Sequence, residues 1–508
     1  MAIDQRAREY PDRPAIMMSD GSEMLMFAQL DDRSAKLAGA LRNGIAEPGD
    51  RIAMLMDNCA DCLVLAWACR RAGLRLVPIN WHLVSAEMRY VIEDSDSVAV
   101  IARPQLAREH SFAGSNARLL VTGSDPVGDY APLEPLIAAA APIAPEDQRE
   151  GAIMFYSSGT TGKPKGILRP LSEEPFGTPN AVESVLMPAL FRFQPGQSVY
   201  LSPAPLYHAA PLAYCVAALF LGGTVVIMPQ FEPEGVLQAI ERHRVTHAQF
   251  VPTHFVRMLR LPEEVRAAHD LSSLQCAIHA AAPCPPKVKR EMIEWWGPII
   301  EEYYAGSEGV GFTYIGSSDW LAHPGSVGRS PVDPIHVLDE DGQPVPTGEI
   351  GMVYFEGSVP FSYHKAPEKT QGSYSPQGYA SIGDMGYLDE DGFLYLADRK
   401  SHMIISGGVN IYPQEIEHAL AEHAAVADIA VIGVPNEDLG EEVKAIVELR
   451  PGHSGDEAMA DALMAFAAER LARFKLPRSF AFVDELPRLP NGKLLKRQLR
   501  DDYWKETA

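Results

Sequence analysis

One segment of the sequence carries the residue types that hold a polyphosphate. Residues 156–166 read Tyr-Ser-Ser-Gly-Thr-Thr-Gly-Lys-Pro-Lys-Gly, which puts four Ser/Thr hydroxyls, three glycines and two lysines into eleven residues. Glycine lets backbone N–H groups close around an anion, hydroxyls add hydrogen-bond donors, and lysine adds positive charge. The alternative is a flexible linker, but linkers rarely interleave lysines so tightly. We therefore expect a phosphate-binding loop here.

The spacing within this loop differs from that of P-loop nucleotidases. A P-loop has four residues between its first glycine and a Gly-Lys pair, and Ser or Thr follows that pair. Here two residues separate Gly159 from Gly162, and Pro164 follows Lys163. Because a helix does not easily continue through proline, the sequence predicts a phosphate grip of another kind.

Composition and charge limit the class of protein. The chain has 508 residues, of which 46% are hydrophobic and 22% charged, as in a soluble globular protein of two to four domains. Its net charge of −23 argues against nucleic acid or an anionic membrane as the main partner. The longest apolar run, residues 212–228, is broken by Gly222-Gly223 and predicts a buried helix and strand, not a membrane span. Since the first residues lack a signal-peptide core, we expect a cytoplasmic location.

Cysteine and histidine spacings give no clear metal site. Six cysteines in a chain of this size suggest a reducing compartment and no disulfide framework. Cys59 and Cys62 form a C-x-x-C pair with Cys69 two turns beyond, which predicts cysteines of a core helix, with a metal or redox site as the alternative. His243 and His247 are four residues apart. A helix is expected to end near His243, so these two histidines are predicted to be structural.

Helix and strand patterns alternate up to about residue 303, as in a layered α/β protein with largely parallel sheets. A helix is expected at 60–71, between strands at 51–56 and 75–78. From about residue 325, strands joined by Asp-Gly and Thr-Gly turns indicate a β-rich subdomain. The remainder reads as a small α+β unit whose first helix begins at Pro413. We therefore predict an N-terminal domain of 1–398, with its β-rich subdomain at 325–398, and a C-terminal domain of 399–508.

Five segments, in this order, resemble motifs of the adenylate-forming superfamily of acyl-CoA synthetases, carrier-loading adenylation domains and beetle luciferases. The phosphate loop is the first. The others are Tyr303-Tyr304-Ala305-Gly306-Ser307-Glu308, Ser381-Ile382-Gly383-Asp384, Asp398-Arg399-Lys400 with Ser406-Gly407-Gly408-Val409-Asn410-Ile411-Tyr412-Pro413, and Leu489-Pro490-Asn491-Gly492-Lys493. One such motif is moderately specific, whereas five in order over nearly the whole chain are very specific.

The resemblance implies an acid–CoA ligase that works in two steps. A carboxylate attacks the α-phosphate of ATP to form an acyl-adenylate and pyrophosphate, and the thiol of coenzyme A then displaces AMP. ATP, Mg²⁺ and coenzyme A are therefore the expected cofactors. A mobile C-terminal domain would present Lys493 for the first step and the turn Ser406-Gly407-Gly408 for the second. Its hinge position falls on Ser401, where relatives often have aspartate or lysine, which puts the balance between the two orientations in doubt.

The resemblance also assigns residues to the nucleotide. Glu308 is the expected Mg²⁺ ligand, and Ser307 the contact to the α-phosphate, where the family more often has threonine. Asp384 and Arg399 are expected to bind the ribose hydroxyls. The phosphates are assigned to Ser157, Ser158, Gly159, Thr160, Thr161, Gly162, Lys163 and Lys165, with Thr160 also counted as catalytic, and adenine to Ala281, Ala282, Pro283, Tyr303 and Tyr304. Ordinary turn residues are the alternative for Glu308 and Asp384.

The acid substrate is less well defined. His208 resembles the family's gate beside the acid channel, with a packed histidine as the alternative. Small residues at 280–282 and 305–306 leave space near the adenylate, and the apolar segments 185–193 and 206–214 favour an apolar acid, either a chain or a ring. Residues 167–180 are expected to form a lid or an inserted loop. The oligomeric state stays open, with a homodimer among the alternatives.

Two other functions are compatible with these motifs. An amide-forming or carrier-loading ligase would pass the same adenylate to an amine or a tethered thiol. Gly452-His453-Ser454 faintly resembles a phosphopantetheine attachment site, but no separate domain surrounds it. A nucleotide sensor without turnover is the non-catalytic alternative, and the intact Glu308, Asp384, Arg399 and Lys493 argue against it.

Lys493 is expected to accelerate the first step only, because its ammonium would offset charge that develops as the carboxylate meets the α-phosphate. Lys496 and Arg497 nearby are expected to be solvated. We predict that Lys493→Ala abolishes carboxylate-dependent exchange of labelled pyrophosphate into ATP. The same variant should still convert supplied acyl-adenylate and coenzyme A into thioester. Equal loss of both half-reactions would contradict this role.

Overall fold

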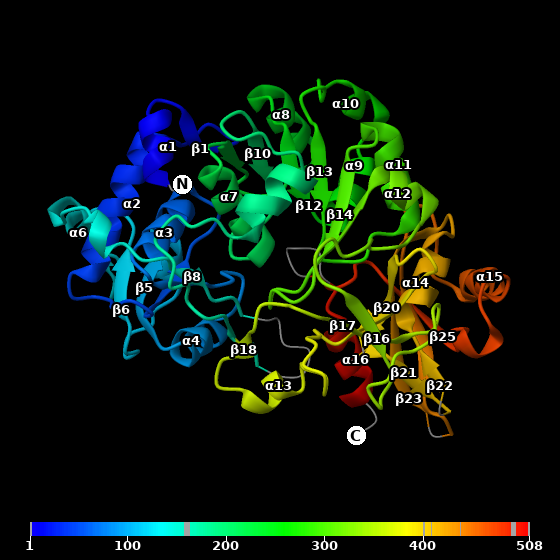
Figure 1. Ribbon diagram of the computed structural model, residues 1–508. Helices are drawn as coiled ribbons and strands as arrows, with labels where there is room; N and C mark the ends of the chain where they lie inside the picture. Colours follow the sequence, from blue (N-terminus) through cyan, green and yellow to red (C-terminus); the bar gives the residue numbers. More distant parts are fainter. Residues whose placement is uncertain are drawn as a thin grey trace. The chain divides into compact units, whose positions relative to one another are not determined.

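The computed structural model describes residues 3–156, 163–399, 402–407, 409–436, 438–488 and 494–505 (Figure 1). The chain forms two compact units, each assembled from separate stretches. The first contains Met1–Phe250, Arg260–Ile278 and Val359–Gln371, and the second contains Val251–Leu259, His279–Ser358 and Gly372–Ala508. The domain boundary expected at residue 399 lies inside the second unit and stays a prediction.

A parallel six-stranded sheet forms the N-terminal part of the first unit, drawn in blue and cyan in Figure 1. Its strands lie in the order β7-β6-β5-β3-β4-β8, and each neighbouring pair is parallel. In chain order they are β3 (Arg51–Leu55), β4 (Arg75–Pro78), β5 (Ser97–Ala102), β6 (Arg118–Val121), β7 (Ala131–Pro132) and β8 (Ala152–Ile153). This arrangement confirms the predicted layered α/β fold, because parallel neighbours require the crossover connections that the alternating pattern indicated.

Helices connect these strands and cover the sheet. α3 (Ala60–Arg71) joins β3 to β4, and α4 (Ser85–Asp94) joins β4 to β5. Eleven of the twelve residues of α3 are buried, so this helix is enclosed on nearly all sides, as expected for a core helix. Cys62 and Cys69 are among them, and Cys59 is buried just before the helix.

A second sheet of the first unit contains β13-β12-β10-β11-β1-β2. The first pair of its strands in the chain, β1 (Pro14–Met18) and β2 (Met24–Met26), is antiparallel, whereas β1 pairs in parallel with a strand more than two hundred residues later. The others are β10 (Val199–Ser202), β11 (Thr224–Ile227), β12 (His247–Phe250) and β13 (Cys276–His279), with α7 (Ala209–Phe220) and α8 (Pro233–His243) between them. The helix and strand predicted for residues 212–228 are therefore present as α7 and β11. Within the described residues, no helix is long and apolar enough to cross a membrane.

The second unit begins with an antiparallel pair, β14 (Ile300–Tyr304) and β15 (Thr313–Gly316). A four-stranded antiparallel sheet follows in the order β16-β17-β19-β20. Its strands are β16 (Ile335–Leu338), β17 (Gly351–Phe355), β19 (Asp384–Leu388) and β20 (Leu394–Arg399). These strands agree with the β-rich subdomain that the Asp-Gly and Thr-Gly turns after residue 325 predicted.

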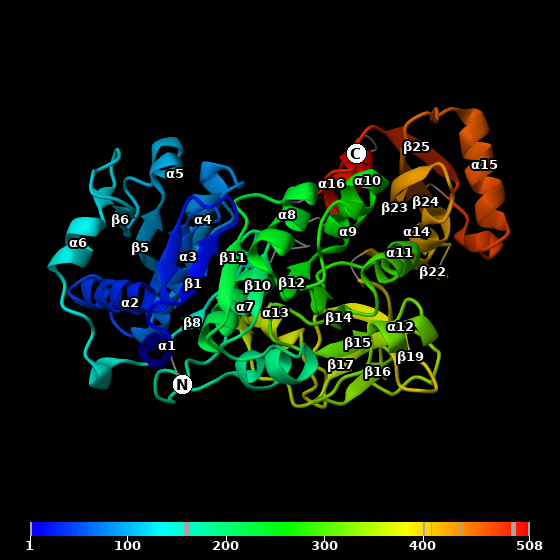
Figure 2. The same cartoon turned by 90° about the horizontal axis from the view of Figure 1, so that it is seen from above.

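The C-terminal part of the second unit is a mixed sheet with helices on both faces (Figure 2). β23 (Val426–Asn436) and β24 (Gly440–Leu449) form its centre, and β25 (Ser479–Val483) runs parallel to β24. Alternate residues of β23 point to opposite faces. Val431 packs with α14 (Pro413–Ala421) and α15 (Glu457–Ala468), whereas Ile432 packs with α16 (Lys496–Lys505).

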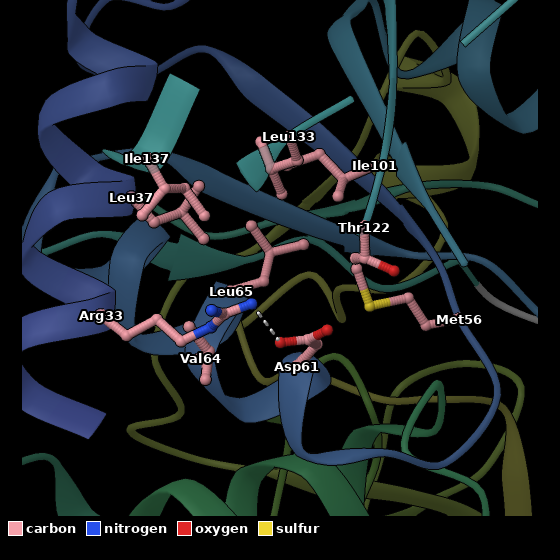
Figure 3. Close-up of a pocket in the computed structure, with 10 residues that line it drawn as sticks. All are labelled: Arg33, Leu37, Met56, Asp61, Val64, Leu65, Ile101, Thr122, Leu133 and Ile137. Carbon is pink, nitrogen blue, oxygen red and sulfur yellow. Dashed lines mark hydrogen bonds and ion pairs between the residues drawn. The ribbon is translucent and has the colours of Figure 1, made fainter. Parts of the chain in front are cut away.

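A small pocket lies in the first unit, lined by residues of α2 (Phe27–Arg42), α3 and α6 (Glu134–Ala139) (Figure 3). Its walls are mostly apolar, and the Arg33 guanidinium reaches Asp61 at 3.1 Å within it. Arg33 also pairs with Glu134. None of the residues predicted to bind nucleotide or acid lines this pocket, so we treat it as part of the packing between these helices.

A buried arginine holds the segment that was expected to be a lid or an inserted loop. The Arg70 guanidinium of α3 pairs with Glu150 at 2.5 Å and with Glu183, which is 1% exposed. It also donates to the carbonyl of Thr178 at 3.4 Å, and Glu150 accepts the N–H of Gly177 at 2.9 Å. Thr178 and Glu183 are thus bonded directly to the core helix, and the role of residues 167–180 as a lid or an inserted loop stays a prediction.

The Arg70–Glu183 pair provides a stability test. Removing one partner of a buried ion pair leaves a buried charge undercompensated and costs about 3 kcal/mol or more. We expect Glu183→Ala to lower the free energy of unfolding by about this amount, measured by urea denaturation. Asp32→Asn breaks the exposed Lys36–Asp32 pair and serves as the control, with a loss below about 1 kcal/mol. Equal losses in both variants would contradict the importance of this buried pair.

Candidate functional site

Several predicted site residues lie outside the described residues. These are Ser157, Ser158, Gly159, Thr160, Thr161 and Gly162 of the phosphate loop, Ser401 of the hinge, Gly408 of the glycine turn, and Lys493. The geometry below therefore concerns the residues that flank these positions and the predicted nucleotide ligands of the second unit.

The residues that flank the phosphate loop form a narrow antiparallel base. Tyr156 and Gly166 form a β-bridge, and the N–H of Ile167 donates to the carbonyl of Phe155 at 2.8 Å. A Cβ at Gly166 would lie 2.2 Å from Met154 Cε and 3.1 Å from Tyr156 Cζ, so a larger residue at this position would require these side chains to shift. On the later side of the loop, the Lys163 ammonium lies 4.7 Å from the centre of the Tyr90 ring. The Tyr90 hydroxyl donates to the carbonyl of Pro164 at 3.1 Å.

A second layer of contacts supports this base. The Tyr156 hydroxyl donates to Asp94 Oδ2 at 2.9 Å, and burial together with the Asp94 carboxylate raises the pKa of this tyrosine. Lys365 donates to the carbonyl of Asp94 and to Asp96 Oδ1, both at 2.8 Å. The N–H of His364 donates to the carbonyl of Gly166 at 2.7 Å. Residues 364–365 thus fasten the base from a distant part of the sequence, and both ends of the loop are fixed.

The proposed acid gate, His208, stands at the N-cap of α7. Buried Asn58 fixes the chain before it, because its amide donates to the carbonyls of Ala204 at 3.1 Å and Met228 at 2.9 Å. The N–H of Leu206 in turn donates to Asn58 Oδ1 at 2.8 Å. No local pattern indicated this role for Asn58, because its partners are 146 to 170 residues away.

Aromatic rings surround the approach to His208. The ring centres of Tyr207 and His208 are 4.3 Å apart, those of His82 and Tyr207 are 6.3 Å apart, and those of Trp81 and His82 are 3.6 Å apart. Burial raises the pKa of the Tyr207 hydroxyl, so this ring stays neutral. The residues next to His208 therefore present mostly apolar aromatic surface.

In the second unit, the predicted ribose ligands face each other across two strands. Asp384 of β19 lies directly opposite Arg399 of β20, and Arg399 Nε is 3.1 Å from Asp384 Oδ1. The Tyr304 hydroxyl donates to Asp384 Oδ2 at 2.6 Å. Burial raises the pKa of Asp384, and the charge of Arg399 and the Tyr304 hydrogen bond oppose that rise. The structure thus brings Asp384, Arg399 and Tyr304 together.

Glu308 belongs to the same cluster. It is 8% exposed, and its negative charge contributes, with those of Asp384 and Asp398, to raising the pKa of Arg399 against the effect of burial. A tight turn positions it, in which the N–H of Gly309 donates to the carbonyl of Gly306 at 2.9 Å. A Cβ at Gly306 would lie 3.1 Å from Glu308 Oε2. A carboxylate beside nucleotide phosphates suits Mg²⁺, which binds one or two carboxylates together with phosphate oxygens.

The two tyrosines assigned to adenine point in different directions. Tyr303 and Tyr304 are neighbours in β14, and successive strand residues face opposite sides. Tyr304 reaches Asp384, whereas Tyr303 is 7% exposed and stacks on Phe312 with ring centres 5.5 Å apart. Tyr304 is therefore the ring on the side of the predicted ribose ligands, and the adenine contact of Tyr303 stays a prediction.

The other predicted adenine segment contains a strained residue. Ala281 has a φ of +75°, a conformation that residues other than glycine rarely adopt. Ala281 and Pro283 are exposed, and Ala282 is half-buried. Just before them, His279 is fully buried against the Lys289–Glu302 ion pair. Backbone strain held above a buried charge pair is typical of a binding segment.

The glycine turn joins β21 (Ile404–Ser406) to β22 (Val409–Ile411). Ser406 pairs with Val409, so the connection has two residues. Gly407 adopts a φ of +57°, as tight two-residue hairpins require. Its N–H donates to the carbonyl of Leu439 at 2.8 Å.

The remaining cysteine and histidine pairs occupy separate environments. The sulfur atoms of Cys59 and Cys62 are 3.7 Å apart at the start of α3. His243 ends α8 and contacts the carbonyl of Ser19, whereas His247 contacts the carbonyl of Phe191 at 2.9 Å. Within the described ranges, no group of three or more His, Cys, Asp or Glu side chains is arranged to hold a metal ion.

One prediction about the C-terminal tail is wrong. Lys496 was expected to be solvated, but its side chain is 12% exposed. Its ammonium lies 2.8 Å from Glu417 and 3.5 Å from Asp398. The partners are 79 and 98 residues away, so no local pattern indicated the burial.

Comparison with known proteins identifies the family. Residues 3–362 match the AMP-binding enzymes, and residues 415–493 match the C-terminal domain of AMP-binding enzymes. The chain belongs to this family. It is 31% identical over 507 residues to the sulfoacetate–CoA ligase of Cupriavidus necator, covering 98% of this chain and 96% of that enzyme. It is 33% identical over 499 residues to the feruloyl-CoA synthase of an Amycolatopsis species, covering 98% and 97%.

A solved member of this AMP-binding enzyme family has the same fold. The structure of ATP-bound MatB from Rhodopseudomonas palustris superposes with a TM-score of 0.83, at 29% identity and full coverage of both chains. The first matched range contains the phosphate loop and the segment 303–308, and the second contains the segment 489–493.

The Tyr304–Asp384 hydrogen bond predicts a shift in pH dependence. This bond lowers the pKa of the buried Asp384 carboxylate, so its loss in Tyr304→Phe raises that pKa further. Protonated Asp384 no longer accepts from both ribose hydroxyls, and KM for ATP therefore rises as the pH falls. In Tyr304→Phe, we expect this rise to begin at a higher pH than in the wild type, and KM at neutral pH to increase about tenfold.

Tyr387→Phe is the matched control for this experiment. Tyr387 is also in the β19–β20 pair, but it stacks on Tyr395 with ring centres 4.9 Å apart and does not contact Asp384. Its pH profile for KM should coincide with that of the wild type. Coincident profiles for Tyr304→Phe and the wild type would show that Tyr304 does not act on the ribose carboxylate.

Proposed function

We propose that this AMP-binding enzyme is an ATP-dependent acid–CoA ligase in which the Tyr304–Asp384–Arg399 cluster holds the ribose of ATP. The cluster is the observation that carries the assignment, because it joins residues from three separate family motifs at hydrogen-bond distance. A carboxylate that accepts from vicinal hydroxyls is a recurrent ribose ligand. The full-length similarity to enzymes named as CoA ligases supports the overall reaction.

The first half-reaction is assigned to groups that neutralise charge. The phosphate loop grips the β- and γ-phosphates with Thr160, Thr161, Gly162 and Lys165, and its rigid base at Tyr156 and Gly166 keeps the loop in register. Glu308 would hold Mg²⁺, which neutralises phosphate charge when bound. Lys493 bridges the incoming carboxylate and the α-phosphate. This division follows the chemistry of phosphoryl-type transfer, in which positioning and electrostatics matter more than covalent help.

The second half-reaction delivers coenzyme A to the adenylate. The C-terminal domain turns about Ser401 and places the hairpin around Gly407 and Gly408 beside the pantetheine path. A two-residue hairpin with small residues suits this role, because a narrow path needs close approach of the backbone. If an amine accepted the acyl group in place of coenzyme A, the first half-reaction would be the same.

The acid is proposed to be apolar and ring-bearing. The aromatic group of Trp81, His82, Tyr207 and His208 supports this choice, since ring pairs of this kind favour stacking with another ring. The two relatives carry the names of a sulfonated and an aromatic acid at nearly equal identity, so overall similarity does not select the acid. The choice therefore depends on the residues around His208.

A panel of acids tests this proposal. Purified enzyme is incubated with ATP, Mg²⁺, coenzyme A and one acid each from aromatic, medium-chain, dicarboxylic and sulfonated classes, and AMP and acyl-CoA are measured. We expect equal amounts of AMP and acyl-CoA, with the highest kcat/KM for an aromatic acid. Asp384→Ala should lose AMP formation with every acid. AMP release that needs an amine and not coenzyme A would replace the proposed acceptor, and a preference for small charged acids would contradict the apolar assignment.

A further inference from the structure

The end of β20 carries two charged residues with different tasks. Arg399 faces Asp384 and the predicted ribose site. Asp398, its neighbour, points to the other side of the strand, as successive strand residues do. There its carboxylate accepts from His402 Nδ1 at 3.1 Å, from the N–H of Gln414 at 3.3 Å and from Lys496 Nζ at 3.5 Å. The three donors all come after residue 401 in the chain.

Lys496 is fixed firmly to the C-terminal sheet. Its ammonium lies 2.8 Å from Glu417 Oε1 on α14, and the same carboxylate oxygen accepts the N–H of Val431 at 2.6 Å. Lys496 begins α16, which is held to β23 by a hydrogen bond of 3.2 Å from Trp504 Nε1 to the carbonyl of Gly433. Lys496 therefore moves together with the C-terminal sheet.

Asp398 and Lys496 are buried but remain charged. Despite burial, the neighbouring Lys496 ammonium and His402 lower the pKa of Asp398 to about 2. Burial also opposes the charge of Lys496, but Glu417 and Asp398 together raise the pKa of its ammonium. His418, which is packed beside them, has its pKa lowered to about 4 by burial and by the charge of Lys496, and is neutral at pH 7. A buried ion pair of this kind resists the loss of either partner.

The predicted hinge at Ser401 lies between Asp398 and these three donors, whereas a fourth donor, the N–H of Arg399 at 2.6 Å, precedes the hinge. A rotation about residues 400–401 would carry His402, Gln414 and Lys496 away from Asp398 together. Glu417 moves with Lys496, because both follow the hinge, so the ammonium keeps one carboxylate throughout the rotation. The cluster can thus open without leaving a bare buried lysine, and it can exist in only one of the two orientations.

We propose that Asp398 and Lys496 form a latch that stabilises one orientation of the C-terminal domain and thereby sets the balance between the two half-reactions. Both are positioning residues: Lys496 is three residues from Lys493, and Asp398 adjoins the ribose ligand Arg399. The latch also links nucleotide binding to domain orientation, because the end of β20 carries both the predicted ribose ligand Arg399 and the latch residue Asp398. This inference rests on the proposed two-step function.

The latch is tested with Asp398→Asn, Lys496→Met and the double variant. Pyrophosphate exchange reports the first half-reaction, and thioester formation from supplied acyl-adenylate reports the second, each with the preferred acid from the panel. We expect the ratio of the two rates to change about fivefold or more in each single variant. The double variant should change the ratio no further, because both substitutions break one interaction.

Lys475→Met is the control. Lys475 pairs with Glu415 on the same helix α14 at 2.6 Å, but neither residue contacts Asp398 and both follow the hinge. This variant should leave the ratio unchanged. An equal loss of both half-reactions in Asp398→Asn, or the same ratio change in Lys475→Met, would overturn the latch and show a purely structural role.

A second readout does not need turnover. Spin labels are attached at Asp341→Cys and Ala424→Cys, two exposed positions on either side of the hinge, while the six native cysteines are buried. We expect Asp398→Asn to enlarge a second population in the distance distribution between the labels, and an unchanged distribution would refute the latch. If the wild-type enzyme activates no acid but Asp398→Asn still changes the distance distribution in this way, the proposed function is overturned and the latch is retained.

Discussion

The pairing of Asp384 with Arg399 across β19 and β20 is the interaction on which the rest of the site depends. Two opposite charges directly opposed on neighbouring strands fix each other without help from flexible loops. Their burial makes the arrangement demanding, because a buried carboxylate needs a cation and hydrogen-bond donors to remain charged. Arg399 supplies the cation and Tyr304 the donor, and Glu308 adds a further negative charge near Arg399.

The strand that carries Arg399 also explains how binding and movement can be joined. Because adjacent strand residues face opposite sides, Asp398 contacts the C-terminal part of the second unit while Arg399 contacts Asp384, the other predicted ribose ligand. A small displacement at the end of β20 therefore acts on both faces. In the first unit, by contrast, the base of the phosphate loop is fixed in place, because Tyr90, Asp94 and Lys365 hold it by hydrogen bonds.

Local patterns in the sequence were sufficient to predict many of the helices and strands. The helix at 60–71 and the strand at 75–78 were predicted to the residue, because an apolar run between turn residues determines each of them. The β1 strand was not predicted, since it pairs with residues 225–227, more than two hundred positions away. The motif residues Asp384 and Arg399 were identified by resemblance, and the structure shows them paired.

The missed residues share one physical property. Asn58, Lys365 and Lys496 act through partners that are distant in sequence, and nothing in the local sequence distinguishes them from solvated polar residues. Lys496 illustrates the point, because a basic run at the start of a terminal helix usually faces water. Its burial followed only from the positions of Glu417 and Asp398.

The most direct test of the ribose assignment compares AMP with 2′,3′-dideoxy-AMP by calorimetry, in the wild type and in Asp384→Asn. If Asp384 binds the ribose hydroxyls, the substitution weakens AMP binding about tenfold or more, while both proteins bind the dideoxy nucleotide with the same low affinity. Wild-type affinity for 2′,3′-dideoxy-AMP equal to that for AMP would contradict the account.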